Sequence, residues 1–167
     1  FDHICCSVSS EGGVSENGIL RHTDATSVSS LTTGNTYALV GVRLQSAKID
    51  AVIDLLNLSL LCSSSNDNAK WEIIFNPTIA GTFTYSDLAD SVVQTASGAS
   101  TNTITGGIVV SGGFFTTSQP VTAAQIKPAA KRLGSAINGT RDEMVLAVTP
   151  LTSNITVSAS ITWVELS

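Results

Sequence analysis

The sequence predicts an all-β fold, an antiparallel β-sandwich of the jelly-roll type with at most one short helix. Ser and Thr make up roughly a quarter of the 167 residues and charged residues only 13%, so the side chains that usually cover helices are scarce. The closing strand, Asn154–Leu166, alternates apolar and hydroxyl-bearing residues, the pattern of a strand with one buried face. Short strand-like segments recur about every 8–12 residues, as in sandwiches and jelly rolls.

The N-terminal part of the chain is expected to contain two strands. The first covers Ile4–Val8 and leads into a glycine-containing turn at Ser10–Asn17. Ile19–Ser30 is polar and rich in Ser and Thr, without a helical period. Thr36–Leu44 is predicted as a strand that follows a turn at Gly34-Asn35.

The segment Lys48–Cys62 admits two interpretations. A helical spacing connects Ile49, Val52, Ile53 and Leu56. A looser alternation connects Ile53, Leu55, Asn57, Ser59 and Leu61. We favour a strand, with a helical turn as the alternative, and a loop at Ser63–Asn68.

Four strands are expected in the middle of the chain: Trp71–Asn76, Gly81–Tyr85, Ser91–Thr95 and Thr101–Val110. Pro77 ends the first, because proline disfavours central ladder positions. The pairs Gly106-Gly107 and Gly112-Gly113 interrupt the pattern, as bulges or tight turns do.

The final third contains the single candidate helix, Ala123–Ile137. Ala129, Ala130 and Leu133 favour a helix, and Pro128 fits its first turn. A strand with Leu133, Ser135 and Ile137 on one face is an equal alternative. A turn at Asn138–Thr140, a strand at Glu143–Thr149 and the closing strand complete the chain.

The chain is expected to form a single β-sandwich domain over residues 1–167. Because it begins with Phe1, we expect it to be the C-terminal part of a longer protein. Cys5, Cys6 and Cys62 form an odd, small set, which predicts reduced thiols rather than a disulfide framework.

Charge and motifs exclude several functions. A net charge of −5 with eight scattered Lys and Arg residues disfavours nucleic-acid and anionic-membrane partners, and no apolar run is long enough to span a bilayer. His22 near Asp24 lacks a nucleophile elbow, His3 with Cys5 and Cys6 makes a weak metal set, and Asn66–Asn68 lacks most calcium ligands. We therefore expect no catalytic residue, no cofactor and no metal.

Two features indicate a subunit interface. Phe114 and Phe115 are adjacent, so one of them should leave the local core if they lie on a strand. The closing strand presents an uncharged row of hydroxyls, Thr156, Ser158, Ser160 and Thr162. Aromatic residues could alternatively line a sugar-binding groove, although Trp71 and Trp163 fit core positions better. We take Phe114, Phe115 and the hydroxyl row as the candidate interface.

Three segments carry a resemblance to a known family. The opening FDHICCSVSSEGG (Phe1–Gly13), NPTIAGT (Asn76–Thr82) and the end of the chain, from VTPLTSN (Val148–Asn154) to WVE (Trp163–Glu165), are similar to segments of virion structural proteins of tailed bacteriophages. The resemblance covers most of the chain. Those proteins are longer, with another β-rich region upstream.

The resemblance implies a structural role without catalysis, in a decoration, cement or head-fibre-type surface domain. It further implies a location in the virion, assembly in the bacterial cytoplasm, a homotrimer, and contacts with capsid or tail subunits. The alternative is a receptor-binding tip of a tail fibre or tailspike that recognises a host glycan.

Overall fold

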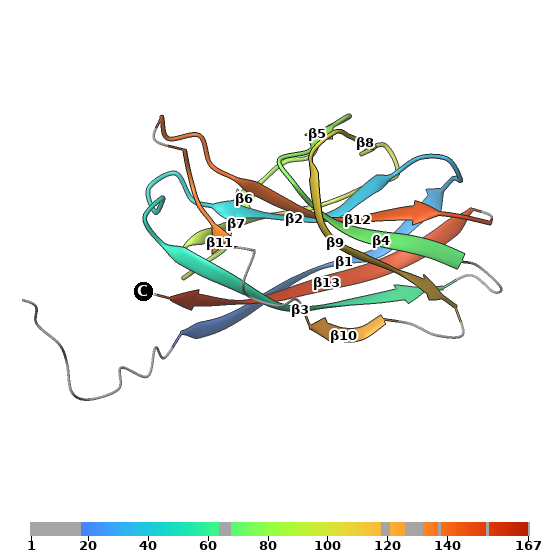
Figure 1. Ribbon diagram of the computed structural model, residues 1–167, viewed down its shortest axis with the longest axis horizontal. Coiled ribbons are helices and arrows are strands. Elements are labelled where there is room, and N and C mark those ends of the chain that lie inside the picture. The colour runs from blue at the N-terminus through green and yellow to red at the C-terminus, as the bar shows by residue number, and fades with distance from the viewer. Residues whose placement is uncertain are drawn as a thin grey trace, which may run out of the picture.

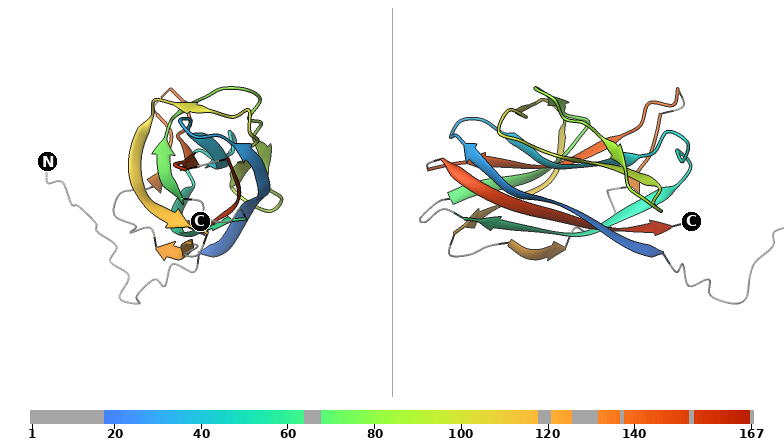
Figure 2. Two further views of the ribbon diagram at one scale, coloured as in Figure 1. Left: turned by 90° about the vertical axis from the view of Figure 1, so that its right-hand side faces the viewer. Right: turned by 180° about the vertical axis from the view of Figure 1, so that it is seen from behind.

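The computed structural model describes residues 18–63, 68–117, 121–125, 132–136, 138–152 and 154–166. Antiparallel strands form two sheets that pack face to face (Figures 1 and 2). Sheet A has the order β1-β13-β3-β10, with β11 also paired to β3. Sheet B has the order β6-β7-β2-β12-β4-β9, and a separate pair joins β5 to β8. The predicted all-β sandwich is confirmed.

Sheet A contains β1 (Ile19–Leu31), β3 (Val52–Cys62), β10 (Val121–Gln125), β11 (Arg132–Leu133) and β13 (Ile155–Leu166). Sheet B contains β2 (Tyr37–Leu44), β4 (Asn68–Phe75), β6 (Ser86–Asp87), β7 (Val93–Ser97), β9 (Ile108–Thr116) and β12 (Glu143–Pro150). The separate pair is β5 (Thr78–Ile79) and β8 (Ile104–Thr105).

The strand connections are those of a jelly roll. The row β1-β13-β3-β10 faces the row β2-β12-β4-β9, and the chain crosses between the sheets at nearly every step. β1 and β13, which come first and last along the chain among the strands of sheet A, are neighbours, as the double Greek key requires. The strands β5 to β8 form an insertion between β4 and β9, here called the β4–β9 insertion (residues 76–107).

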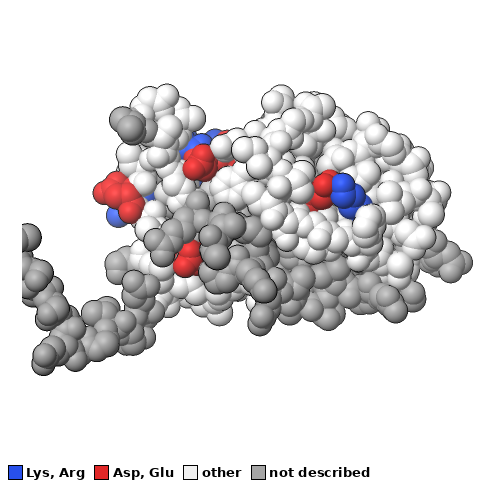
Figure 3. Space-filling view, in the orientation of Figure 1, with Lys and Arg blue, Asp and Glu red and all other residues white. Residues whose placement is uncertain are grey.

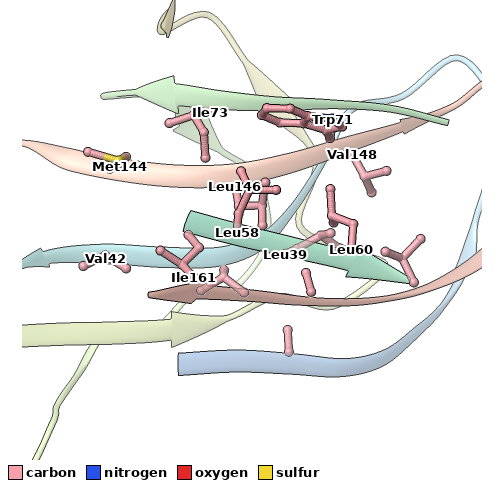
Figure 4. Packing of buried hydrophobic residues seen from close by; sticks show 14 of the residues in the cluster. Leu39, Val42, Leu58, Leu60, Trp71, Ile73, Met144, Leu146, Val148 and Ile161 are labelled. Carbon is pink, nitrogen blue, oxygen red and sulfur yellow. The ribbon is translucent and has the colours of Figure 1, made fainter. Parts of the chain in front are cut away.

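The closing strand lies in the middle of sheet A, between β1 and β3. Its side chains alternate between buried and half-buried over the whole of β13, which confirms the predicted two-residue period. The buried row, Ile155 to Trp163, enters the main core between the sheets. Figure 4 shows Leu58, Leu60 and Ile161 of sheet A meeting Leu39, Leu146 and Trp71 of sheet B.

A register shift in β3 explains the ambiguous period of Lys48–Cys62. Asn57 pairs with Thr162, but the next pair joins Leu55 to Trp163, so Leu56 is an extra residue. The buried positions therefore step by three between Leu55 and Leu58, which imitates helical spacing. The favoured strand interpretation is confirmed.

β1 is a strand that its sequence pattern did not reveal. Its pairing with β13 shifts between Ala25 and Val28 and again between Val28 and Leu31. Ser27 and Ser30 have φ values of 54° and 61°, a conformation that interrupts the alternation of side chains. Only three of its residues are buried, Ala25, Val28 and Leu31.

The helix considered for Ala123–Ile137 is wrong where the structure describes that segment. Ala123–Gln125 belong to β10, which pairs with the middle of β3, and Arg132–Leu133 form β11, which pairs with Ile53 and Asp54. Residues 126–131 and 137 lie outside the described part. The open edge of β3 offers ladder partners, and this tertiary pairing outweighs the helix propensity of the alanines.

Most other predicted strands are confirmed within a few residues: Thr36–Leu44, Trp71–Asn76, Ser91–Thr95 and Glu143–Thr149 coincide with β2, β4, β7 and β12. Thr101–Val110 divides into β8 and the start of β9, because Gly106 and Gly107 adopt positive φ at a turn. Ile4–Val8, the turn at Ser10–Asn17, Cys5, Cys6 and most of the loop at Ser63–Asn68 lie outside the described residues.

The expected strand Gly81–Tyr85 is wrong, because this segment has no ladder partner. It lies on the outer face of sheet B, where Phe83 and Ile79 pack against a second, small cluster of Ala38, Ile74, Ile104, Val145 and Ala147. The side chain of Asn102, fully buried, replaces the ladder: its Nδ2 donates to the carbonyl oxygens of Ala80 (3.1 Å) and Thr82 (3.0 Å).

One carboxylate interrupts the apolar inner row of β13. Glu165 is only 4% exposed, and Oε1 accepts hydrogen bonds from Nε1 of Trp163 (3.1 Å) and from the hydroxyl of Ser91. Nε of Arg21 lies 3.9 Å from Oε2. Through these contacts Glu165 ties the loop before β7 to sheet A, so its buried charge has a structural role.

Candidate functional site

The hydroxyl row of the closing strand lies on the outer face of sheet A. Thr156, Ser158, Ser160 and Thr162 are all half-buried, because β1 and β3 flank them. Oγ of Ser160 lies 2.8 Å from Oγ of Ser59 on β3, and Oγ of Ser158 accepts from the backbone N–H of Ser27 at 3.0 Å. The row is therefore an uncharged surface whose hydroxyls are partly engaged across the strands.

The two adjacent phenylalanines point to opposite sides of β9. Phe115 is 3% exposed and belongs to the main core. Phe114 is 73% exposed and stands opposite Lys70 on the outer side of sheet B. The interface prediction is thus corrected for Phe115: of the two, only Phe114 lies where a partner subunit could reach it.

Phe114 belongs to an apolar edge strand. β9 is the last strand of sheet B, and its sequence, IVVSGGFFT, contains no charged residue and no proline. Ile108 and Val109 are also exposed. Edge strands usually carry charges, prolines or bulges that limit pairing with other chains; β9 has no charge and no proline, and its one register shift places Val110 as an extra residue opposite β4. The sandwich places it and the hydroxyl row on different faces, and the structure does not bring the two candidates together.

The β4–β9 insertion creates a groove that the sequence did not predict. Its volume is about 410 Å³, within the range of about 300–1,000 Å³ that small-ligand sites occupy. Sheet B supplies Arg43 from β2 and Glu143 from β12. The insertion supplies Pro77, Ile79, Gly81, Phe83, Thr84 and Tyr85.

An ion pair forms the polar side of the groove. Nη1 of Arg43 lies 2.8 Å from Oε1 of Glu143, and the two side chains are about a quarter exposed. Nε of Arg43 donates to Oε1 of Gln94 at 2.8 Å, and Nε2 of Gln94 donates to Asp87 at 2.7 Å. Arg141 donates to the same Gln94 oxygen at 2.9 Å. These bonds hold the guanidinium of Arg43 in one position.

Tyr85 forms the aromatic side of the groove together with Phe83. The guanidinium carbon of Arg43 lies 4.1 Å from the centroid of the Tyr85 ring, a cation–π contact. The rings of Phe83 and Tyr85 meet edge to face at 5.5 Å. Burial raises the pKa of Tyr85 above its usual value, the charge of Glu143 adds to this, and Arg43 opposes it. The Tyr85 hydroxyl is buried and has no hydrogen-bond partner among the described residues.

Gly41 has no side chain, and this lets Phe83 and Tyr85 approach sheet B. A Cβ at position 41 would lie 2.6 Å from both Cε1 of Phe83 and the hydroxyl oxygen of Tyr85. Gly41 on β2 is therefore required for this arrangement. Together with the bonds from Asn102, it fixes the wall of the groove without a strand ladder.

The described residues contain no group of three or more His, Cys, Asp and Glu side chains placed to hold a metal ion. Across the same part of the chain, no helix has the length and apolar character to cross a membrane. His22 and Asp24 are exposed on β1, and Trp71, Trp163 and Cys62 are buried. The groove is a polar concavity whose ion pair and aromatic rings suit recognition of a small polar ligand.

Sequence reasoning missed the groove because its ion pair is formed across sheet B. Arg43 and Glu143 are separated by 100 residues, and only the register of β2 with β12 makes them opposite neighbours. The one local signal was the pair Phe83 and Tyr85 between Pro77 and a polar loop, and it was interpreted as a strand.

Comparison with known proteins gives no match: no family model, no curated protein and no solved structure is similar to the chain. The groove, the edge strand β9 and the hydroxyl row therefore have to be interpreted from their own geometry and chemistry.

Proposed function

We propose that this chain is a non-catalytic structural domain on the surface of a tailed-bacteriophage particle, of the decoration, cement or head-fibre type, which assembles as a homotrimer. The observation that carries the assembly role is the uncharged edge strand β9 with its exposed Phe114. The phage setting, with assembly in the bacterial cytoplasm, rests on the resemblance of Phe1–Gly13, Asn76–Thr82 and Val148–Asn154 to virion proteins.

The scarcity of surface charge supports subunit packing. On the face shown in Figure 3, charged side chains of the described residues form a few separate spots. Uncharged surfaces lose little hydration when a neighbour covers them. The jelly roll supports the same role, because capsid domains use it, although lectins and cupins use it too.

Two different surfaces suit a ring of copies. A cyclic trimer joins one patch of each subunit to a different patch of the next. Phe114 on sheet B and the hydroxyl row on sheet A lie on different faces, so each can contact a different neighbour. Other virion proteins, such as capsid or tail subunits, are the further partners that this role requires.

Size-exclusion chromatography with light scattering tests the assembly at micromolar concentration. We expect a mass three times that of the 17.2 kDa chain, and dissociation when Phe114→Asp places a charge on β9. Ser160→Lys tests the hydroxyl row in the same way. Leu151→Asp is the matched control, because Leu151 is exposed outside both surfaces. A wild-type monomer would refute the homotrimer.

Gold-labelled antibodies against the chain test the virion role. Label on the heads of phage particles supports the decoration or head-fibre role, and particles that stay unlabelled in a lysate containing the chain contradict it. Label on the tails supports the second candidate, a receptor-binding tip of a tail fibre or tailspike that recognises a host glycan. The groove beside Tyr85 is the observation that favours this second function.

A further inference from the structure

We infer that the groove between Arg43, Phe83, Tyr85 and Glu143 binds a neutral pyranose unit of a carbohydrate. This goes beyond the proposed assembly role and does not depend on it, because the groove is complete within one chain.

The charge of the groove favours a neutral ligand. Glu143 neutralises Arg43 at 2.8 Å. The surrounding hydrogen-bond network contains one further guanidinium, that of Arg141, and two carboxylates, those of Asp87 and Asp142, so it adds no net positive charge. An anionic ligand would find no net positive field, and a cation would compete with Arg43 for its partner. Phosphate and other small anions are therefore disfavoured.

The ion pair keeps unused capacity for hydrogen bonds. It engages Oε1 of Glu143 and Nη1 of Arg43, while Oε2 and Nη2 make no hydrogen bond within the described part of the chain. A carboxylate oxygen accepts and a guanidinium nitrogen donates. Neighbouring hydroxyls of a sugar both donate and accept, so one pair of hydroxyls can satisfy both groups with charge-assisted bonds.

The opposite side of the groove is apolar. Phe83 and Ile79 are half-buried there, packed on the small outer cluster of sheet B. Arg43 already covers one face of the Tyr85 ring, so Phe83 and Ile79 provide a small apolar surface within a mostly polar lining. A pyranose is rich in hydroxyls and has a small face of C–H groups, which suits a mostly polar groove with a small apolar part. A purely aliphatic ligand would leave the ion pair without partners.

The wall of the groove is held before any ligand arrives. Asn102 fixes residues 80–82 by two hydrogen bonds, and its Oδ1 accepts from the N–H of Ala99 at 2.8 Å. Gln94 holds the Arg43 side chain. A prearranged site loses less conformational entropy on binding, which matters for a ligand as small as one sugar.

Saturation-transfer NMR with a panel of methyl glycosides tests the inference on the whole chain. The panel contains methyl glucoside, galactoside, mannoside, N-acetylglucosaminide and N-acetylgalactosaminide, with inorganic phosphate as an anionic probe. We expect at least one glycoside to bind with a dissociation constant on the order of 1 mM. The changes that this glycoside causes in the amide spectrum of the protein should centre on Arg43, Thr84, Tyr85 and Glu143. Phosphate should not bind.

Glu143→Gln keeps the shape of the side chain but removes the charged acceptor, so we expect binding at least about tenfold weaker. Glu72→Gln is the matched control, because Glu72 is also paired, with Lys70 at 2.6 Å, outside the groove. It should leave binding unchanged. The amide spectrum of each variant reports folding, and shift mapping on the wild type needs no variant.

The inference would be overturned if no glycoside binds at about 20 mM, if the shift changes fall outside the groove, or if Glu143→Gln and Glu72→Gln have equal effects. Preferential binding of phosphate would overturn it as well. None of these results bears on the trimer, since the mass measurement depends on β9 and the hydroxyl row.

Discussion

Tyr85 shows how one side chain combines opposing interactions. Its ring gains contacts with Arg43 at 4.1 Å and with Phe83, while its buried hydroxyl has no partner in the described part of the chain. An unsatisfied buried hydroxyl costs stability. The ring therefore stabilises the wall of the groove, whereas the oxygen opposes the same arrangement.

Tyr85→Phe should raise the unfolding free energy at neutral pH by up to about 1 kcal/mol, because the unpaired oxygen disappears and the ring remains. The variant should also respond less to alkali. The pKa of Tyr85 is raised in the folded state, first by burial and then by Glu143, so the folded protein binds the phenol proton more tightly than the unfolded protein, and this linkage contributes fully to stability below the unfolded value of about 10. That contribution is lost as pH rises above it.

Urea unfolding at pH about 8 and about 11 measures both effects, since the unfolded pKa lies between these values. The wild type should lose more stability over this interval than Tyr85→Phe. Equal losses would contradict the raised pKa, and a large loss of stability in the variant at neutral pH would show that the hydroxyl has a partner.

At the scale of elements, the sequence predicts best those strands whose apolar and polar side chains alternate without interruption. The closing strand alternates without a break, and it was predicted with its buried row. β1 has positive φ at Ser27 and Ser30, and β3 carries an extra residue at Leu56. Such local irregularities depend on the partner strand, so they leave no reliable pattern in the sequence.

The β4–β9 insertion illustrates the same limit for the site. Residues 81–85 look like a strand because Phe83 and Tyr85 alternate with polar neighbours. The segment instead lies on sheet B, where a buried side chain, Asn102, replaces the ladder. The ion pair of the groove forms only when β2 and β12 pair, which no local pattern indicates.

Asn102→Ala should destabilise the protein by about 3 kcal/mol, because a fully buried side chain is lost and three partly buried backbone groups lose their partner. These are the carbonyls of Ala80 and Thr82 and the N–H of Ala99. Hydrogen exchange should accelerate in residues 76–107 before it does in β12 or β13.

Asn138→Ala is the matched control for this substitution. Oδ1 of Asn138 accepts one bond, from the N–H of Thr140 at 3.0 Å, in an exposed turn. We expect a loss of less than about 1 kcal/mol, since water replaces the partner. Similar losses for both variants would mean that Asn102 does not replace the ladder.

At the scale of the whole molecule, the jelly roll joins parts that are far apart in the chain. Sheet A places β13 between β1 and β3, so its first strand has no neighbour until the last one arrives. Sheet B likewise places β12 between β2 and β4. Both sheets therefore depend on late strands, and folds dominated by such distant pairings fold slowly.

Refolding from urea should accordingly take on the order of a second, the slow end for sandwich proteins. Trp71 and Trp163 are the two tryptophans, and both lie in the core, so stopped-flow fluorescence reports both sheets. A brief unfolding pulse separates this phase from proline isomerisation, which takes tens of seconds. Complete refolding within about a millisecond would contradict the expectation.

The central position of β13 has a consequence for the nascent protein. A ribosome makes β1 and β3 long before it makes the strand that joins them. During that time the inner faces of both strands, with Leu31, Leu58 and Leu60 among them, have no complete sheet to cover them. Only after Leu166 has left the exit tunnel can sheet A close. A translational pause or truncation before that point would expose apolar strands to chaperones or to aggregation, whereas an early pause would have little effect.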